Sequence, residues 1–138
     1  MRTVNIFFCG LFMDEELLRT KGVTTTQMRP AFVADFELRI GDRATLVAAQ
    51  SSRVFGMVAS LSHIDLEHLY SAYDVQSYRP EALIAQLENG EIIAPLCFSL
   101  VDPPAHDERN PEYAAKLRAL AERLNFSADY VASIQWAP

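Results

Sequence analysis

The sequence predicts an α+β fold, a small mixed, largely antiparallel β-barrel of five or six strands flanked by helices. Strand-like stretches mostly follow one another in hairpin order, and helical stretches occur after the first strand, after the middle strands and at the end. The two kinds do not alternate regularly, which argues against a doubly wound sheet. A curled or closed sheet also removes exposed edges. The 138 residues suit a single domain over 1–138.

The N-terminal segment predicts a buried strand, a glycine loop and a short helix. Val4 to Cys9 is an apolar, β-branched and aromatic run that Gly10 interrupts. Asp14 can then cap a helix that Gly22 ends. A strand that leads directly into a glycine loop and a helix start forms a natural anion site, because several backbone N–H groups point the same way.

Longer strands are expected in the middle of the chain. Apolar and polar residues alternate over 31–40, which is typical of a half-buried strand. A further strand is expected over 53–61, where Gly56 suits a bulge or a close approach of another backbone. Asn89-Gly90 is a hairpin signal, and it predicts that 92–101 returns antiparallel to the preceding strand.

Three further helices are indicated by their capping residues. Ser62 starts a helix that the apolar spacing extends to about residue 73. Asn110 caps a second helix with Pro111 at its first position, and Ser127 starts a short final helix.

Composition and charge exclude several classes of partner. The chain has 12 Lys and Arg against 18 Asp and Glu, a net charge of −6, and no basic run, so no nucleic acid is expected to bind. The apolar run 6–13 is far shorter than the ~20 residues of a bilayer span, and the acidic residues after it do not suit a secretory signal. We therefore expect a cytoplasmic protein with no membrane partner, in which Cys9 and Cys97 are buried reduced thiols.

The sequence predicts no metal and no cofactor. His63 and His68 are five positions apart on one expected helix, which turns them away from each other and prevents them from sharing a metal ion. The sequence also lacks a nucleophile-elbow serine motif and a phosphate-binding glycine series. Cys9 has no histidine beside it in sequence to act as a base, so a nucleophilic role is not favoured.

Several segments, in this order, resemble the γ-glutamylcyclotransferase-like family. Ile6 to Met13 looks like the strand and glycine loop that open the family. Arg53 to Val58 looks like the family's strand that enters a helix with an acidic residue at its end. Further similar segments are Tyr78-Arg79, the Asn89-Gly90 hairpin, the helix start at 110–113 and the short helix with its own tyrosine near 124–130. The resemblance spans nearly the whole chain.

The resemblance implies a small mixed β-barrel flanked by helices, with a cavity where the first loop meets an acidic residue. Enzymes of this family convert γ-glutamyl amines into 5-oxoproline and the free amine, so the implied ligand is a small γ-glutamyl or amino-acid-like molecule. Asp74 stands at the catalytic acid/base position, and the implied substrate-binding residues are Cys9, Gly10, Leu11, Phe12, Tyr78 and Tyr113.

The chemistry of ring closure explains why such residues are needed. The α-amine of the substrate attacks its own γ-carbonyl, so one group must take a proton from the ammonium and return it to the leaving nitrogen. A carboxylate in a partly apolar cleft, with its pKa raised toward neutrality, suits this double role. Backbone N–H groups of a glycine loop can hold the α-carboxylate almost regardless of side chain.

Other interpretations remain open. The family usually has glutamate, tyrosine and a hydroxyl residue where this chain has Asp74, Cys9 and Leu11. These differences favour an alternative, a module that binds a small carboxylate or a peptide end without turnover. Asp74 can also be a solvated helix end, the two tyrosines can be core residues, and Glu67 or Glu81 can supply the carboxylate. A third hypothesis is an interaction surface on the C-terminal helices formed by Leu117, Leu120, Leu124 and Trp136.

Overall fold

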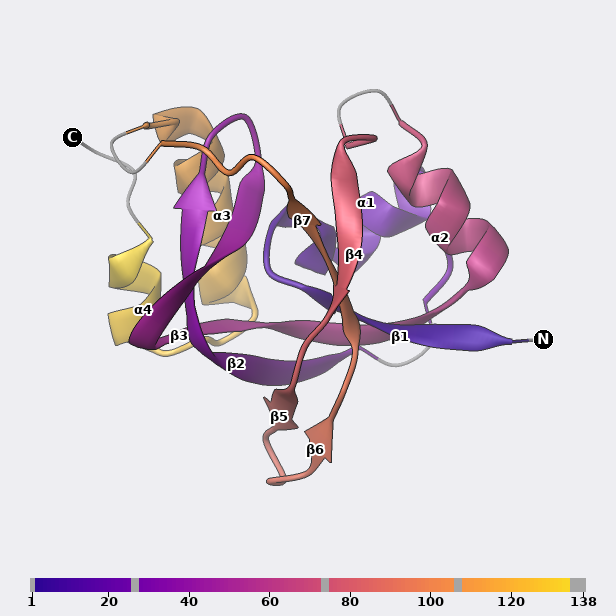
Figure 1. Cartoon of the computed structure of the whole chain (residues 1–138), viewed down its shortest axis with the longest axis horizontal. Coiled ribbons are helices and arrows are strands. Elements are labelled where there is room, and N and C mark those ends of the chain that lie inside the picture. The colour runs from indigo at the N-terminus through magenta and orange to yellow at the C-terminus, as the bar shows by residue number, and fades with distance from the viewer. Residues whose placement is uncertain (1, 26–27, 73–74, 106–107, 135–138) are drawn as a thin grey trace.

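One strongly bent sheet carries the fold, and helices cover its two ends (Figure 1). The computed structural model describes residues 2–25, 28–72, 75–105 and 108–134. Seven strands are ordered β4-β7-β1-β3-β2-β5-β6. They are β1 (Thr3–Phe8), β2 (Arg29–Ile40), β3 (Ala44–Ser62), β4 (Tyr78–Ala82), β5 (Ala85–Leu87), β6 (Ile92–Ile93) and β7 (Leu96–Leu100). The helices are α1 (Glu15–Thr20), α2 (His63–Tyr70), α3 (Pro111–Arg123) and α4 (Ala128–Ser133), with a 3₁₀ turn at Leu11–Met13.

The pairing is mixed and largely antiparallel, which confirms the predicted fold class. β1 pairs antiparallel with β3 and parallel with β7. The hairpin over residues 78–100 has one interruption in each of its two strands, so it counts as four strands. In it β4 pairs with β7, and β5 pairs with β6. Because the base of this hairpin joins β1 and its tip joins β2, the sheet curls round on itself. The strand count therefore exceeds the predicted five or six.

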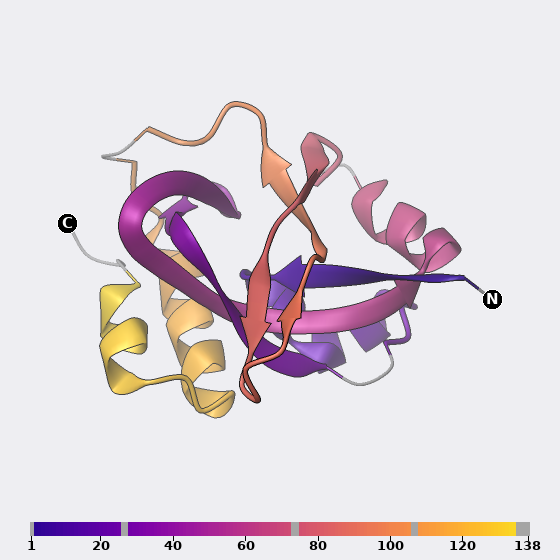
Figure 2. The same cartoon turned by 60° about the horizontal axis from the view of Figure 1, so that its bottom comes forward.

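β3 is longer than predicted, starting at Ala44 rather than near residue 53. Apolar and polar residues do not alternate over 44–52, and the β2–β3 register shifts between Ala34 and Phe36, near the end of this part of β3. Asp35 and Ser51 both adopt positive φ at this irregularity, with values of 66° and 69°, and the Asp35 carboxylate accepts a hydrogen bond from the Ser51 N–H at 3.1 Å. Beyond it the β2–β3 hairpin continues and curls above α3 and α4 (Figure 2).

The predicted helix caps are confirmed. The side chains of Asp14, Ser62, Asn110 and Ser127 each accept a hydrogen bond from a backbone N–H of the following helix. α2 ends at Tyr70 rather than near residue 73. α1 and α2 lie at one end of the sheet and α3 and α4 at the other (Figure 1).

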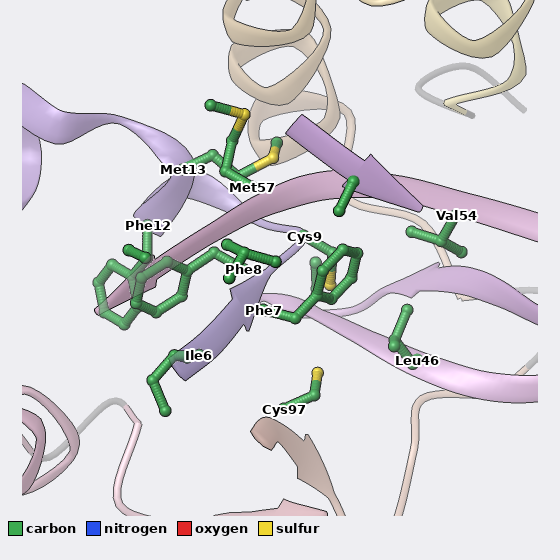
Figure 3. Close-up of a cluster of buried hydrophobic side chains, with 14 of the residues drawn as sticks. Ile6, Phe7, Phe8, Cys9, Phe12, Met13, Leu46, Val54, Met57 and Cys97 are labelled. Carbon is green, nitrogen blue, oxygen red and sulfur yellow. The ribbon is translucent and has the colours of Figure 1, made fainter. Parts of the chain in front are cut away.

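The core lies against β1 and β3, and Gly56 is necessary to its packing. Phe7 and Phe8 of β1 are buried in the cluster that Figure 3 shows. A Cβ atom at Gly56 would lie 2.2 Å from the Phe8 carbonyl oxygen and 2.6 Å from Cζ of Phe7. The predicted close approach at this glycine is therefore confirmed.

Candidate functional site

The first loop is fixed against α3 by a tyrosine. The chain leaves β1 and forms the 3₁₀ turn, closed by a hydrogen bond from the Met13 N–H to the Gly10 carbonyl at 3.0 Å. The Leu11 N–H donates to the Tyr113 hydroxyl at 3.2 Å. A Cβ at Gly10 would lie 2.6 Å from that hydroxyl, so glycine here allows the contact. One of the backbone donors expected to hold a carboxylate thus already has an internal partner.

The residues that the resemblance implies for substrate binding lie around one cavity of about 40 Å³. It is bounded by the end of β1, the first loop, the start of β3, α2, β4, β7 and α3. Asp74 lies outside the described residues, but the next residue, Val75, lines the cavity. The implied residues on the cavity wall are Cys9, Gly10, Leu11, Phe12, Tyr78 and Tyr113.

Aromatic side chains keep this cavity small. The ring of Phe12 meets Phe8 and Tyr70 edge-on, at centroid distances of 5.9 and 5.8 Å. Tyr70 in turn stacks on Phe98 at 4.0 Å. Ligand pockets usually have volumes of ~300 to 1,000 Å³. A molecule larger than a few waters therefore requires these rings to move.

Arg43 is the cation of this site, and sequence reasoning missed it. Its guanidinium carbon lies 5.2 Å from the centroid of the Phe12 ring. Its positive charge partly offsets the effect of burial on the pKa values of Tyr70, Tyr78 and Tyr113. Arg43 directly follows the turn at 41–42 and precedes the first half of β3, which was not predicted, so no local pattern in the sequence marks it.

The tyrosine hydroxyls of the cavity are protonated at neutral pH. Burial raises the pKa of Tyr70, Tyr78 and Tyr113 above the usual tyrosine range. The Tyr78 hydroxyl donates to the Ala44 carbonyl at 2.5 Å. Both Tyr78 and Tyr113 therefore have protein partners, in line with the interpretation as core tyrosines, and both residues line the cavity.

Cys9 and Cys97 are both free, buried cysteines, as predicted (Figure 3). A hydrogen bond with Cys97, followed by burial, raises the pKa of the Cys9 thiol well above its usual range. Because the thiolate is the reactive form, this environment disfavours Cys9 as a nucleophile.

The other described residues that the sequence analysis considered do not line this cavity. Glu67 and Glu81 are both exposed to solvent. Leu117 and Leu120 are buried in the core and Leu124 is half-buried, so the interaction-surface hypothesis fails for the leucines, while Trp136 lies outside the described residues.

His63 and His68 are exposed, and among the residues the structure describes no three His, Cys, Asp or Glu side chains gather as metal ligands. None of the described helices is long and apolar enough to cross a bilayer.

Solved structures share this fold. A γ-glutamyl cyclotransferase structure superposes with a TM-score of 0.80 at 15% identity, over 96% of this chain and 86% of its own. An uncharacterised human protein gives 0.79 at 17%, over 97% and 87%, and a mouse AIG2-like protein gives 0.61 at 16%, over 81% and 91%. No protein-family model matches the sequence, and neither does any curated protein. The chain has the γ-glutamylcyclotransferase-like fold, as the resemblance implied.

Proposed function

We propose that this chain binds the glutamyl end of a γ-glutamyl amine and cyclises it, releasing 5-oxoproline and the free amine. The observation that carries the proposal is the convergence of the first loop, Arg43, Tyr78 and Tyr113 on one cavity. The same fold occurs in a γ-glutamyl cyclotransferase. Asp74 is the proposed acid/base, and Val75 beside it lines this cavity.

The proposed chemistry forms one C–N bond and breaks another. The α-ammonium of the substrate gives a proton to the Asp74 carboxylate, and the resulting amine attacks the γ-carbonyl carbon. The bond from that carbon to the leaving nitrogen then breaks, while Asp74 returns the proton to this nitrogen. Asp74 then transfers the second proton from the ring nitrogen to the released amine, which leaves as an ammonium. No oxidant or co-reactant is required, because the reaction is an internal acyl transfer.

The described residues suit the polar parts of such a substrate. Arg43 carries the positive charge that attracts the α-carboxylate. The hydroxyls of Tyr78 and Tyr113 stay protonated near neutral pH and can donate to the oxygen of the γ-carbonyl as negative charge develops there. When Tyr113 turns toward a ligand, the N–H of Leu11 becomes free to bind the carboxylate.

A second candidate is binding without turnover. Its specific support is that the described residues on the cavity wall supply one cation and several hydroxyls but no carboxylate. A site of that kind favours a small carboxylate or a peptide end. The small volume, about 40 Å³, fits a short carboxylate better than a complete γ-glutamyl amine.

The decisive experiment measures 5-oxoproline by mass spectrometry after incubation with a panel of γ-glutamyl amines. We expect product with the parent protein, loss of product with Asp74→Asn, and unchanged turnover with the matched control Glu81→Gln, whose carboxylate is exposed. If Asp74→Asn and the parent form equal amounts of product, the acid/base assignment is wrong.

A thermal-shift measurement with the same ligands separates the two candidates. A ligand present at 100 times its Kd adds about 2.7 kcal/mol of stability. Stabilisation without 5-oxoproline supports the binding module, and Arg43→Gln is expected to abolish the stabilisation in either case.

A further inference from the structure

A second and larger cavity lies between the β2–β3 hairpin and α4. Its volume is about 400 Å³, within the usual range for a small organic ligand. Among the described residues, it shares no lining residue with the cavity beneath the first loop. Residues of β2, β3, the segment before α3, and α4 with the residue after it form its wall.

The β2 edge along this cavity is open. Four consecutive residues, 37–40, line the cavity. Along this stretch β2 pairs with β3 on one side, and β5 reaches β2 only at Ala31 and Phe32. Within the described chain, no strand pairs with the other side of 37–40.

Three arginines contribute to the described part of the cavity wall in an acidic protein. Arg39, Arg53 and Arg109 line it together with Glu37 and Glu108, so these described residues carry a formal excess of one positive charge. The whole chain has a net charge of −6. Arginine presents fixed donors that match carboxylate and phosphate oxygens, so the wall suits an anion.

Arg53 is the arginine best placed for this role. Its guanidinium carbon lies 5.2 Å from the centroids of both Phe32 and Phe55, an aromatic platform that fixes its position. No carboxylate of the described residues lies within ion-pair distance of it. Arg39, by contrast, already bonds to Glu37 at 3.4 Å and to the Pro104 carbonyl at 3.3 Å.

The rest of the wall includes several apolar side chains. Val54, Tyr130 and Ile134 are buried residues of the core that reach this cavity. The Tyr130 hydroxyl donates to the Phe55 carbonyl at 3.3 Å, which ties α4 to the strand that carries Arg53. A ligand with an apolar body can therefore lie here while its charged end faces the guanidinium.

We propose that this second cavity binds a small organic anion, a molecule with one carboxylate or phosphate group and an apolar body. Arg53 holds the anionic group, the β2 edge offers backbone hydrogen bonds, and Tyr130 and Ile134 contact the body. This site is separate from the proposed cyclisation site, because among the described residues the two cavities have no lining residue in common.

The test is a titration of the full-length protein followed by ¹H–¹⁵N NMR, with phenyl phosphate and benzoate as probes. Phenol serves as a control without the anionic group, and inorganic phosphate as a control without the apolar body. We expect saturable shifts at 37–40, 52–54 and 133–134 with at least one of the two probes, and weaker effects of both controls. The probe that binds more tightly identifies phosphate or carboxylate as the preferred group.

Variants locate the anion. Arg53→Gln is expected to weaken binding about tenfold or more, and Arg53→Lys less, because lysine keeps the charge but loses the planar donors. Ser52→Glu adds a negative charge on the wall without removing an arginine, and it is expected to weaken binding as well. Arg43→Gln should leave the affinity unchanged.

Three results would overturn the proposal. One is the absence of saturable shifts up to about 10 mM probe, which corresponds to negligible affinity. Another is a set of shifts centred on Leu11, Arg43 and Tyr78, which would assign the anion to the first cavity. The third is equal affinity of Arg53→Gln, Ser52→Glu and the parent. None of these readouts depends on 5-oxoproline formation, so this proposal and the proposed function can fail independently.

Discussion

The two cavities differ in size, in the chemistry of their walls and in how much the fold determines them. The cavity beneath the first loop has a volume of about 40 Å³, and aromatic rings and two thiols form much of its wall. The cavity beside the β2–β3 hairpin has about 400 Å³ and a wall rich in charged residues. The comparison teaches that a backbone fold determines where a site lies, while side-chain volume determines whether it is open.

Packing accounts for the difference. Around the first loop, Phe8, Phe12, Tyr70 and Phe98 contact one another, and aromatic pairs of this kind contribute about 0.5–1.5 kcal/mol beyond the burial of their area. Charged side chains such as Arg53 retain their hydration and cannot fill a core in this way. We therefore expect substitutions near the first cavity to affect stability more than substitutions near the second.

The largest expected effect comes from Gly56→Ala. The new Cβ would lie 2.2 Å from the backbone oxygen of Phe8, so β1 and β3 must separate beneath the first cavity. We expect a loss of about 3 kcal/mol of unfolding free energy, measured by urea denaturation. Ser52→Ala, on the wall of the second cavity, is the control and is expected to change stability by less than about 0.5 kcal/mol. Equal effects of the two variants would contradict the comparison.

Asn110→Ala tests the connection between the cavities. Asn110 lines the second cavity and starts the helix that carries Tyr113 to the first. Its side chain accepts from the Tyr113 N–H at 3.1 Å and donates to the Gly41 carbonyl at 2.7 Å. Losing both bonds is expected to lower the unfolding free energy, measured by thermal denaturation, by about 2 kcal/mol.

The matched control for Asn110 is another helix cap. Ser127 caps α4 with a single bond to the Tyr130 N–H at 3.2 Å. Ser127→Ala is expected to lower the unfolding free energy by about 1 kcal/mol, measured in the same thermal denaturation series. A loss at Ser127 as large as that at Asn110 would show that the bond to Gly41 contributes nothing.

Stability is also expected to fall at alkaline pH. Burial raises the pKa values of Tyr70, Tyr78, Tyr113 and Tyr130 in the folded protein, so the unfolded chain loses its tyrosine protons first. Their contribution is complete below the unfolded tyrosine pKa of about 10 and declines as pH rises above it, by about 1.4 kcal/mol per pH unit for each group. Urea denaturation between about pH 8 and 11 measures this slope.

A tyrosine variant measures how much of this alkaline slope Tyr78 of the first cavity contributes. Tyr78→Phe removes one of these groups. We expect it to reduce the dependence of the unfolding free energy on pH by the contribution of one proton. An identical slope in this variant would mean that the alkaline loss originates elsewhere in the chain.

The parts of the fold that the sequence predicted correctly depend on interactions between residues close together in the chain. Helix caps such as Asp14 and Ser62 depend on one side chain and the next few N–H groups, so the sequence alone identifies them. The left-handed conformation of Gly90, with φ of 89°, is likewise required by the hairpin turn itself. The first half of β3 was missed because apolar and polar residues do not alternate over 44–52.

Features that depend on distant segments could not be predicted. Arg43 and Phe12 are 31 positions apart in sequence, and only the folded chain brings the guanidinium over the ring. The second cavity combines β2, β3 and α4, and no local motif marks Arg53 as part of it. The small size of the first cavity also depends on contacts between rings from separate elements, such as Tyr70 and Phe98.

The smallest expected effects come from removing one tyrosine hydroxyl beside each cavity. The Tyr78 hydroxyl donates to the Ala44 carbonyl at 2.5 Å beside the first cavity, and the Tyr130 hydroxyl donates to the Phe55 carbonyl at 3.3 Å beside the second. Tyr78→Phe leaves a buried carbonyl without its partner and is expected to lower the unfolding free energy by about 1.5 kcal/mol. Tyr130→Phe removes a longer and weaker bond, so we expect a loss of about 0.5 kcal/mol. Urea denaturation of the two variants at neutral pH checks this order. The reverse order would mean that the carbonyl of Ala44 gains another donor when the hydroxyl is removed, and that the first cavity is less tightly packed than its aromatic contacts indicate.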